Sequence, residues 1–135
     1  VRYPLFDAFD APDTQSACSR RQVSTHPLQA LVTLNSDFAV ARAKALAGRI
    51  YRESPDSSGR VDLAYRLTLA REPSVGERRQ AAEFLAAQAR MLRESGRGDL
   101  ARPSFVPSET DAAEAAAWVD FGLAMLNRNE FVYIP

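Results

Sequence analysis

The chain has 135 residues, of which 46% are hydrophobic and 25% are charged, as in an ordinary globular domain with a single core. Its 17 basic and 17 acidic residues balance, which argues against a general nucleic-acid or polyanion binder, because such proteins carry a visible basic excess. One cysteine cannot form a disulfide within the chain, and no run of about 18 apolar residues is present that could span a membrane.

Residues 1–26 show no helical periodicity. Pro4, Pro12 and the closely spaced aspartates predict an extended or irregular arm. Several large apolar side chains of this arm need burial, so we expect it to lie across the helices. These side chains are Tyr3, Leu5, Phe6 and Phe9.

The first predicted helix begins at Pro27, because proline is favoured at the first helical position, and it runs to about Asn35. The second covers about 37–53, where apolar residues recur with a period near 3.6. Its expected apolar positions are Phe38, Ala41, Ala45, Leu46 and Ile50, with Arg49 on the same stripe. The segment 54–59 is a loop by composition, and a third helix is predicted over 61–71.

Ser74 and Glu77 have the spacing of a capping box, which predicts the start of a fourth helix that ends near residue 95. The fifth helix is predicted to follow Ser108, with Asp111 near its third position, and to end near residue 126. Its composition is apolar on nearly all sides, which is typical of a central, buried helix. We therefore expect three large side chains of this helix in the core: Trp118, Phe121 and Met125.

The predicted fold is therefore all-α, with about five helices in a compact bundle. The domain would comprise an extended arm over 1–26, a helical body over 27–126 and a short β-like tail over 127–135. The first residue is not Met and no signal peptide is recognisable, so we expect this single helical domain to be the C-terminal piece of a longer protein.

The residues most suggestive of chemistry gather in the arm and at the start of the first helix. This candidate cluster, which is either functional or structural, consists of Asp10, Asp13, Cys18, Arg20, Arg21 and His26. Three aspartates, at positions 7, 10 and 13, could supply oxygen ligands to a hard cation such as Ca²⁺, but the spacing is not that of an EF-hand. Asx-turns around Pro12 explain Asp10 and Asp13 better than a metal site does.

Two further interpretations of the cluster stay open. Cys18 and His26 could form a nucleophile–base pair, although no third group that would orient the histidine is evident. The favoured interpretation is a buried structural cysteine and a histidine that caps the helix start or packs against Pro27. Arg20 and Arg21 precede a helix start and could bind an anion, or they could pair with the nearby aspartates and fix the arm to the body. We expect the two arginines to pair with the aspartates. We also expect this chain by itself to hold no metal or haem and to have no catalytic activity.

The order FDAPD, Cys, Arg-Arg and PLQAL-x-x-LN is a specific combination, and it resembles the C-terminal planctomycete-specific domain of unknown function, domain-of-unknown-function family 1553. The matching positions are Phe9–Asp13, Cys18, Arg20, Arg21, Pro27–Leu31, Leu34 and Asn35. Two later segments, LAYRLTLAREPSVGE and AWVDFGLAMLNRNEFVYI, are also similar to the family pattern. The chain departs from that pattern at Val23, where the family has arginine, and at Ser24–His26, where the family has TNT.

The resemblance implies a large, secreted or periplasmic parent protein, often with an N-terminal cytochrome-c-like haem domain. Haem would then belong to upstream domains, because no CxxCH motif is present in this chain. The upstream domains of the same polypeptide are the expected partners, and other proteins come second. The expected role is structural or protein-interacting, and the alternative is a ligand- or anion-binding site on the arm.

Overall fold

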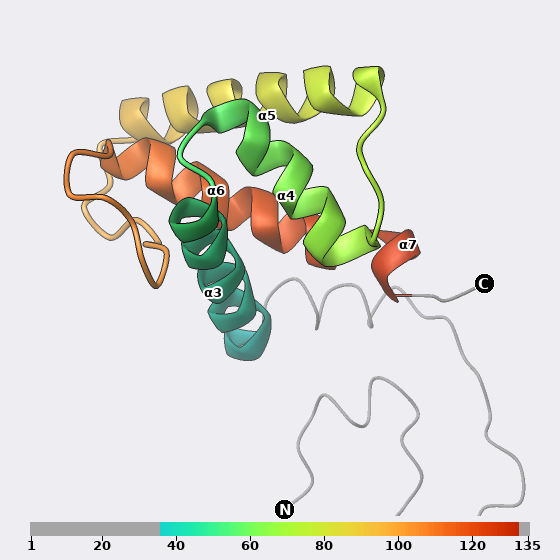
Figure 1. Cartoon of the computed structure of the whole chain (residues 1–135). Helices are drawn as coiled ribbons and strands as arrows, with labels where there is room; N and C mark the ends of the chain where they lie inside the picture. Colours follow the sequence, from blue (N-terminus) through green and yellow to red (C-terminus); the bar gives the residue numbers. More distant parts are fainter. Residues whose placement is uncertain (1–35, 133–135) are drawn as a thin grey trace, which may run out of the picture. The chain divides into compact units, whose positions relative to one another are not determined.

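The computed structural model describes residues 36–132, and all of these except Ser36 belong to the unit of the chain that begins at Asp37. This part is all-α and contains five helices and no strand. Figure 1 shows how the helices are arranged. The helices are α3 (Asp37–Glu53), α4 (Ser57–Leu69), α5 (Val75–Glu94), α6 (Ala112–Leu126) and α7 (Asn129–Val132). The arm and the helix expected at Pro27 lie outside the described residues, as do the last three residues.

Helix α6 is the central element of the bundle. It packs against α3, α4, α5 and α7, and it runs between the other long helices in Figure 1. The Trp118 side chain is 1% exposed, and its ring meets those of Tyr51 and Phe121 edge-on, with centroid distances of 6.2 and 5.6 Å. Phe121 and Met125 are buried as well, so the core predicted for this helix is confirmed.

The contact between α3 and α6 is close because small residues line it. A Cβ atom at Gly122 would lie 3.3 Å from the carbonyl oxygen of Ala43 on α3. The buried side of α3 differs from the predicted stripe, since Phe38 is 54% exposed and Ala41 and Ala45 are exposed too. Ile50 is buried as predicted, but the other core positions of α3 are Ala39, Ala43, Ala47, Gly48 and Tyr51.

Helices α4 and α6 start at other residues than predicted, and an aspartate caps the start of each. Asp56 caps α4 by accepting a hydrogen bond from the Gly59 amide at 2.7 Å, so the helix starts at Ser57 instead of residue 61. Asp111 is the N-cap of α6, where it accepts from the Glu114 amide at 3.1 Å, and is not its third residue. A short polar side chain that satisfies a free amide at a helix start explains both boundaries.

The start of α5 is the capping box predicted from Ser74 and Glu77. The Ser74 hydroxyl accepts from the Glu77 amide at 3.2 Å, and the Glu77 carboxylate accepts from the Ser74 amide at 2.8 Å. Two amides that the helix cannot pair internally are thus satisfied. At the other end of α5, Gly96 takes a positive φ of 64°, a conformation that glycine adopts without strain.

The C-terminal segment corrects the prediction of a β-like tail. Residues Asn129–Val132 form the helical turn α7, in which the amides of Phe131 and Val132 donate to the Arg128 carbonyl at 2.9 and 3.0 Å. None of its residues is buried. The β-type side chains of NEFV are therefore overridden by local backbone bonds and, as described below, by an ion pair of Glu130.

Candidate functional site

None of the six residues of the predicted candidate cluster lies in the described part of the chain. Asp10, Asp13, Cys18, Arg20, Arg21 and His26 all precede Ser36. The pairing expected between the arm's arginines and aspartates, like the ligand-binding alternative, therefore stays a prediction.

The densest polar constellation in residues 36–132 is at the turn between α4 and α5. We call it the corner cluster, and it consists of Arg71, Glu77, Arg128 and Glu130. Its centre is Arg71, which follows the C-cap of α4; that C-cap, Ala70, has a left-handed φ of 54° and so turns the chain sharply out of the helix.

The Arg71 guanidinium binds two carboxylates, each through two hydrogen bonds. It donates to Glu77 at 2.8 and 2.9 Å and to Glu130 at 2.6 and 2.9 Å. Planar guanidinium groups suit such two-point contacts with carboxylates. The capping box orients Glu77 from one side, and Arg71 holds α7 against the α4–α5 turn across 59 residues of sequence.

Arg128 extends the cluster toward Tyr65 of α4. Its guanidinium donates to the Tyr65 hydroxyl at 2.9 Å and to Glu77 at 3.2 Å, and it lies 3.8 Å from Glu130. Arg71 and Arg128 also stand over the Tyr65 ring, at 5.5 and 5.4 Å from its centroid. Two arginines thus contact one buried phenol, and the two glutamates that they bind balance their formal charges.

The electrostatics of the corner cluster favour the charged forms. The hydrogen bonds from Arg71, followed by that from the Ser74 amide, hold the pKa of Glu77 far below its usual range. The hydrogen bond from Arg71 also lowers the pKa of Glu130. The two carboxylates in turn raise the pKa of Arg71. Both glutamates are therefore ionised at neutral pH and act as acceptors only.

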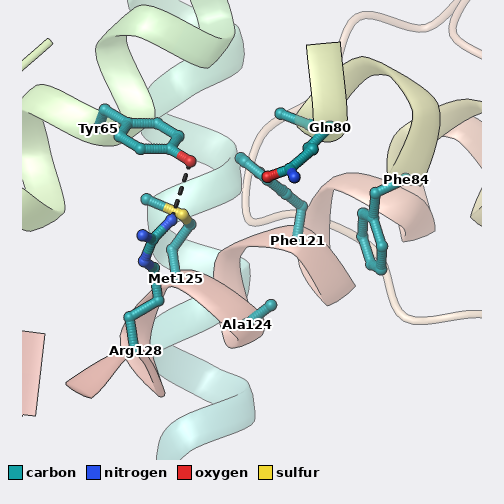
Figure 2. Close-up of a pocket in the computed structure, with 8 residues that line it drawn as sticks. Tyr65, Gln80, Phe84, Phe121, Ala124, Met125 and Arg128 are labelled. Atoms are coloured by element: carbon teal, nitrogen blue, oxygen red, sulfur yellow. Dashed lines mark hydrogen bonds between the residues drawn. The ribbon is translucent and has the colours of Figure 1, made fainter. Parts of the chain in front are cut away.

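An apolar pocket of about 260 Å³ opens beside the cluster, between α4, α5 and α6. Figure 2 shows Tyr65 and Arg128 on one side of it, Gln80 and Phe84 on the other, and Phe121, Ala124 and Met125 of α6 between them. The pocket is lined by Tyr65, Gln80, Ala81, Phe84, Phe121, Ala124, Met125 and Arg128. Apolar walls with a few convergent polar groups are the usual composition of a binding site.

Metal ligands do not converge in this part of the chain. Among residues 36–132, no group of three His, Cys, Asp or Glu side chains is placed to hold an ion. The described helices also include none with the length and apolar character needed to cross a bilayer.

Sequence reasoning found part of this site and missed the rest. Glu77 was predicted as a helix cap, but its second role as the shared partner of two arginines was not. The available signal lay in the two late segments of the family resemblance, because one contains Arg71 and Glu77 and the other contains Arg128 and Glu130. The structure brings these two segments into contact.

Comparison with known families agrees with that resemblance. The family model PSD1, described as "Protein of unknown function (DUF1553)", matches residues 1–85. The match covers more than half of the chain, so the chain belongs to this family. No curated protein and no solved structure matches it significantly.

Proposed function

We propose that this chain is a helical module with a structural, protein-interacting role in a larger, multidomain protein. The observation that carries the proposal is the contrast at the α4–α5 corner. There the charged groups neutralise one another, while an apolar pocket stays open beside them. Paired, hydrogen-bonded charges of this kind fix geometry, and an open apolar pocket can receive an apolar group of a partner.

The proposed partners are, first, upstream domains of the same polypeptide and, second, other proteins. The support is the family resemblance, in which this domain closes large proteins. The same resemblance supports an extracytoplasmic location and a link to a cytochrome-c-like domain, and any haem would belong to that domain. No activity of this chain's own is proposed.

Hydrogen exchange tests the interaction role. The protein encoded by the full gene would be compared with the isolated 135-residue chain, peptide by peptide, by mass spectrometry. We expect amides of α5 to exchange more slowly in the full protein, because α5 is an edge helix with only Ala81 and Ala89 buried. The α3–α6 contact serves as the internal control, since it is already buried in the 135-residue chain. Identical exchange along α5 in the two proteins would contradict the proposal.

Location and haem linkage have their own tests. Cell fractionation should place the full protein outside the cytoplasm. A pyridine haemochrome spectrum should show haem in the full protein and none in the isolated chain. A full protein that is cytoplasmic and colourless would remove this part of the proposal and leave the interaction role unaffected.

A further inference from the structure

The pocket beside the corner cluster contains a hydrogen-bond donor, the Tyr65 hydroxyl, that the ion pairs of the cluster leave available. The Tyr65 side chain is 3% exposed, and its hydroxyl accepts a hydrogen bond from Arg128. A phenol can also donate one hydrogen bond. Among residues 36–132 no acceptor receives that proton. Because Tyr65 lines the pocket, an acceptor brought by a ligand could receive that proton in place of water.

The charge balance decides which acceptor fits. Arg71 and Arg128 are matched by Glu77 and Glu130, two charges against two, so the corner offers no net positive charge to an anion. A carboxylate placed here would also lie close to Glu77. A neutral carbonyl oxygen can accept the Tyr65 proton without that repulsion.

The size and walls of the pocket decide the rest of the ligand. Its volume of about 260 Å³ is below the roughly 300–1,000 Å³ of typical small-molecule sites. Phe84, Phe121 and Met125 supply apolar walls, and Figure 2 shows the Gln80 amide at the side opposite Tyr65. Gln80 is exposed, so its amide is accessible to a ligand, and it can both donate and accept, as a peptide backbone requires.

We propose that this pocket receives one large apolar side chain from an extended segment of a partner polypeptide. The Tyr65 hydroxyl donates to a backbone carbonyl of that segment, and Gln80 pairs with the backbone beside it. This inference rests on the proposed interaction role and assigns that role to a particular pocket.

The two methionines of the chain provide the test, because Met125 lines the pocket whereas Met91 is exposed on α5 outside it. The full 135-residue chain, labelled with ¹³C in its methionine methyl groups, would be titrated with N-acetyl-L-phenylalaninamide. This probe carries an aromatic ring and neutral amide carbonyls. We expect a saturable shift of the Met125 methyl signal and none at Met91.

Two comparison probes check the chemistry. N-acetylglycinamide, which lacks the apolar group, should produce no shift at Met125. Phenylacetate, which carries a negative charge in place of the amide, should bind more weakly than N-acetyl-L-phenylalaninamide. Tighter binding of phenylacetate would overturn the assignment of a neutral acceptor.

Variants locate the binding. Tyr65→Phe keeps the ring and removes the donor, so it should weaken binding about three- to tenfold. Ala124→Leu adds bulk at an exposed pocket position and should abolish the Met125 response, whereas Ala86→Leu, equally exposed but on α5 outside the pocket, should leave it intact. Unchanged tryptophan emission would show that each variant is folded.

The negative outcomes are distinct. Absence of a saturable Met125 shift, or equal shifts of Met91 and Met125, would overturn the pocket assignment. If α5 were nevertheless protected in the full protein, the interaction role would stand and its surface would lie elsewhere. If the Met125 shift were observed but α5 were not protected in the full protein, the interaction role would be contradicted.

Discussion

The α3–α6 contact and the corner cluster hold the same bundle together by different forces. In the first, Gly122 lets α6 approach the backbone of Ala43, and the buried Trp118 ring packs on Tyr51 of α3. In the second, Arg71 links Glu77 and Glu130 at a partly exposed surface. Close apolar packing depends little on pH and is intolerant of changes in volume, whereas ion pairs near solvent respond to protonation and salt.

The difference shows how a small domain can keep a rigid centre and a polar, adjustable edge. Helix α7 belongs to the edge, because none of its residues is buried and Glu130 holds it through Arg71. The proposed binding pocket lies between the two regions, since Met125 and Phe121 belong to the core helix and Arg128 to the cluster. Substitutions on each side should therefore have effects of different size and kind.

The largest effect is expected for Trp118→Ala. Removing a nearly fully buried indole should lower the free energy of unfolding by roughly 3–5 kcal/mol. Urea unfolding followed by circular dichroism measures the loss, and Phe131→Ala, at an exposed position on α7, is the control with little expected change. The intact protein should emit at blue-shifted wavelengths from this single tryptophan; emission typical of indole in water would contradict the burial.

A second core substitution, Gly48→Ala, adds volume where the loop before α6 crosses α3. The new Cβ would lie 2.8 Å from the backbone nitrogen of Phe105, so the loop must move. We expect a loss of about 1–3 kcal/mol in urea unfolding. Gly76→Ala in α5 is the matched control, because the nearest atom to its Cβ is 3.9 Å away and alanine favours the helix. Equal stability of the two variants would argue against a close α3–loop contact.

In the corner cluster, Glu77→Gln should change the pH dependence of stability. The pKa of Glu77 is lower in the folded state than in the unfolded state, so its contribution is complete above about pH 5 and is lost as the pH falls toward the folded-state pKa. The variant should be less stable at pH 7 and should lose less stability on acidification. Glu83→Gln, at an exposed position of α5, is the control. A variant whose melting temperature follows pH as the intact protein does would refute this role of Glu77.

The smallest effect is expected for Tyr51→Phe. The Tyr51 ring packs on Trp118, but its hydroxyl is buried and has no partner among the described residues. Burial raises the pKa of this phenol, so the hydroxyl stays neutral. Removing the hydroxyl therefore removes no charged group. Thermal unfolding should show a change near zero or a slight stabilisation. A large destabilisation would reveal a hydrogen bond that the described structure does not contain.

Local signals in the sequence predicted much of the fold. The capping box at Ser74 placed α5, and the nearly continuous apolar composition of α6 predicted a buried Trp118. The face of α3 could not be predicted, because alanines at every second position from 39 to 47 offer no clear stripe. Which of them are buried is decided by the approach of α6, a tertiary contact that helical periodicity does not encode.

The site was harder to predict than the fold for the same reason. Arg71 and Glu130 are 59 positions apart, and no spacing rule connects them. The β-type composition of NEFV led to the wrong prediction of a β-like tail, because composition carries no information about the Arg71–Glu130 ion pair. Residue types alone drew attention to the arm. Its cluster from Asp10 to His26 lies outside the described residues. A structure of the arm and melting curves with and without added metal would test it.

The division between a packed core and a charge-held edge is tested most directly by Glu130→Gln. Amide hydrogen exchange of this variant and of the intact protein would be compared at pH 7, residue by residue, by NMR. We expect faster exchange of the Phe131 and Val132 amides, which close α7 on Arg128, and unchanged exchange in α3 and α6. Unchanged protection of α7, or a uniform loss across all helices, would contradict the account.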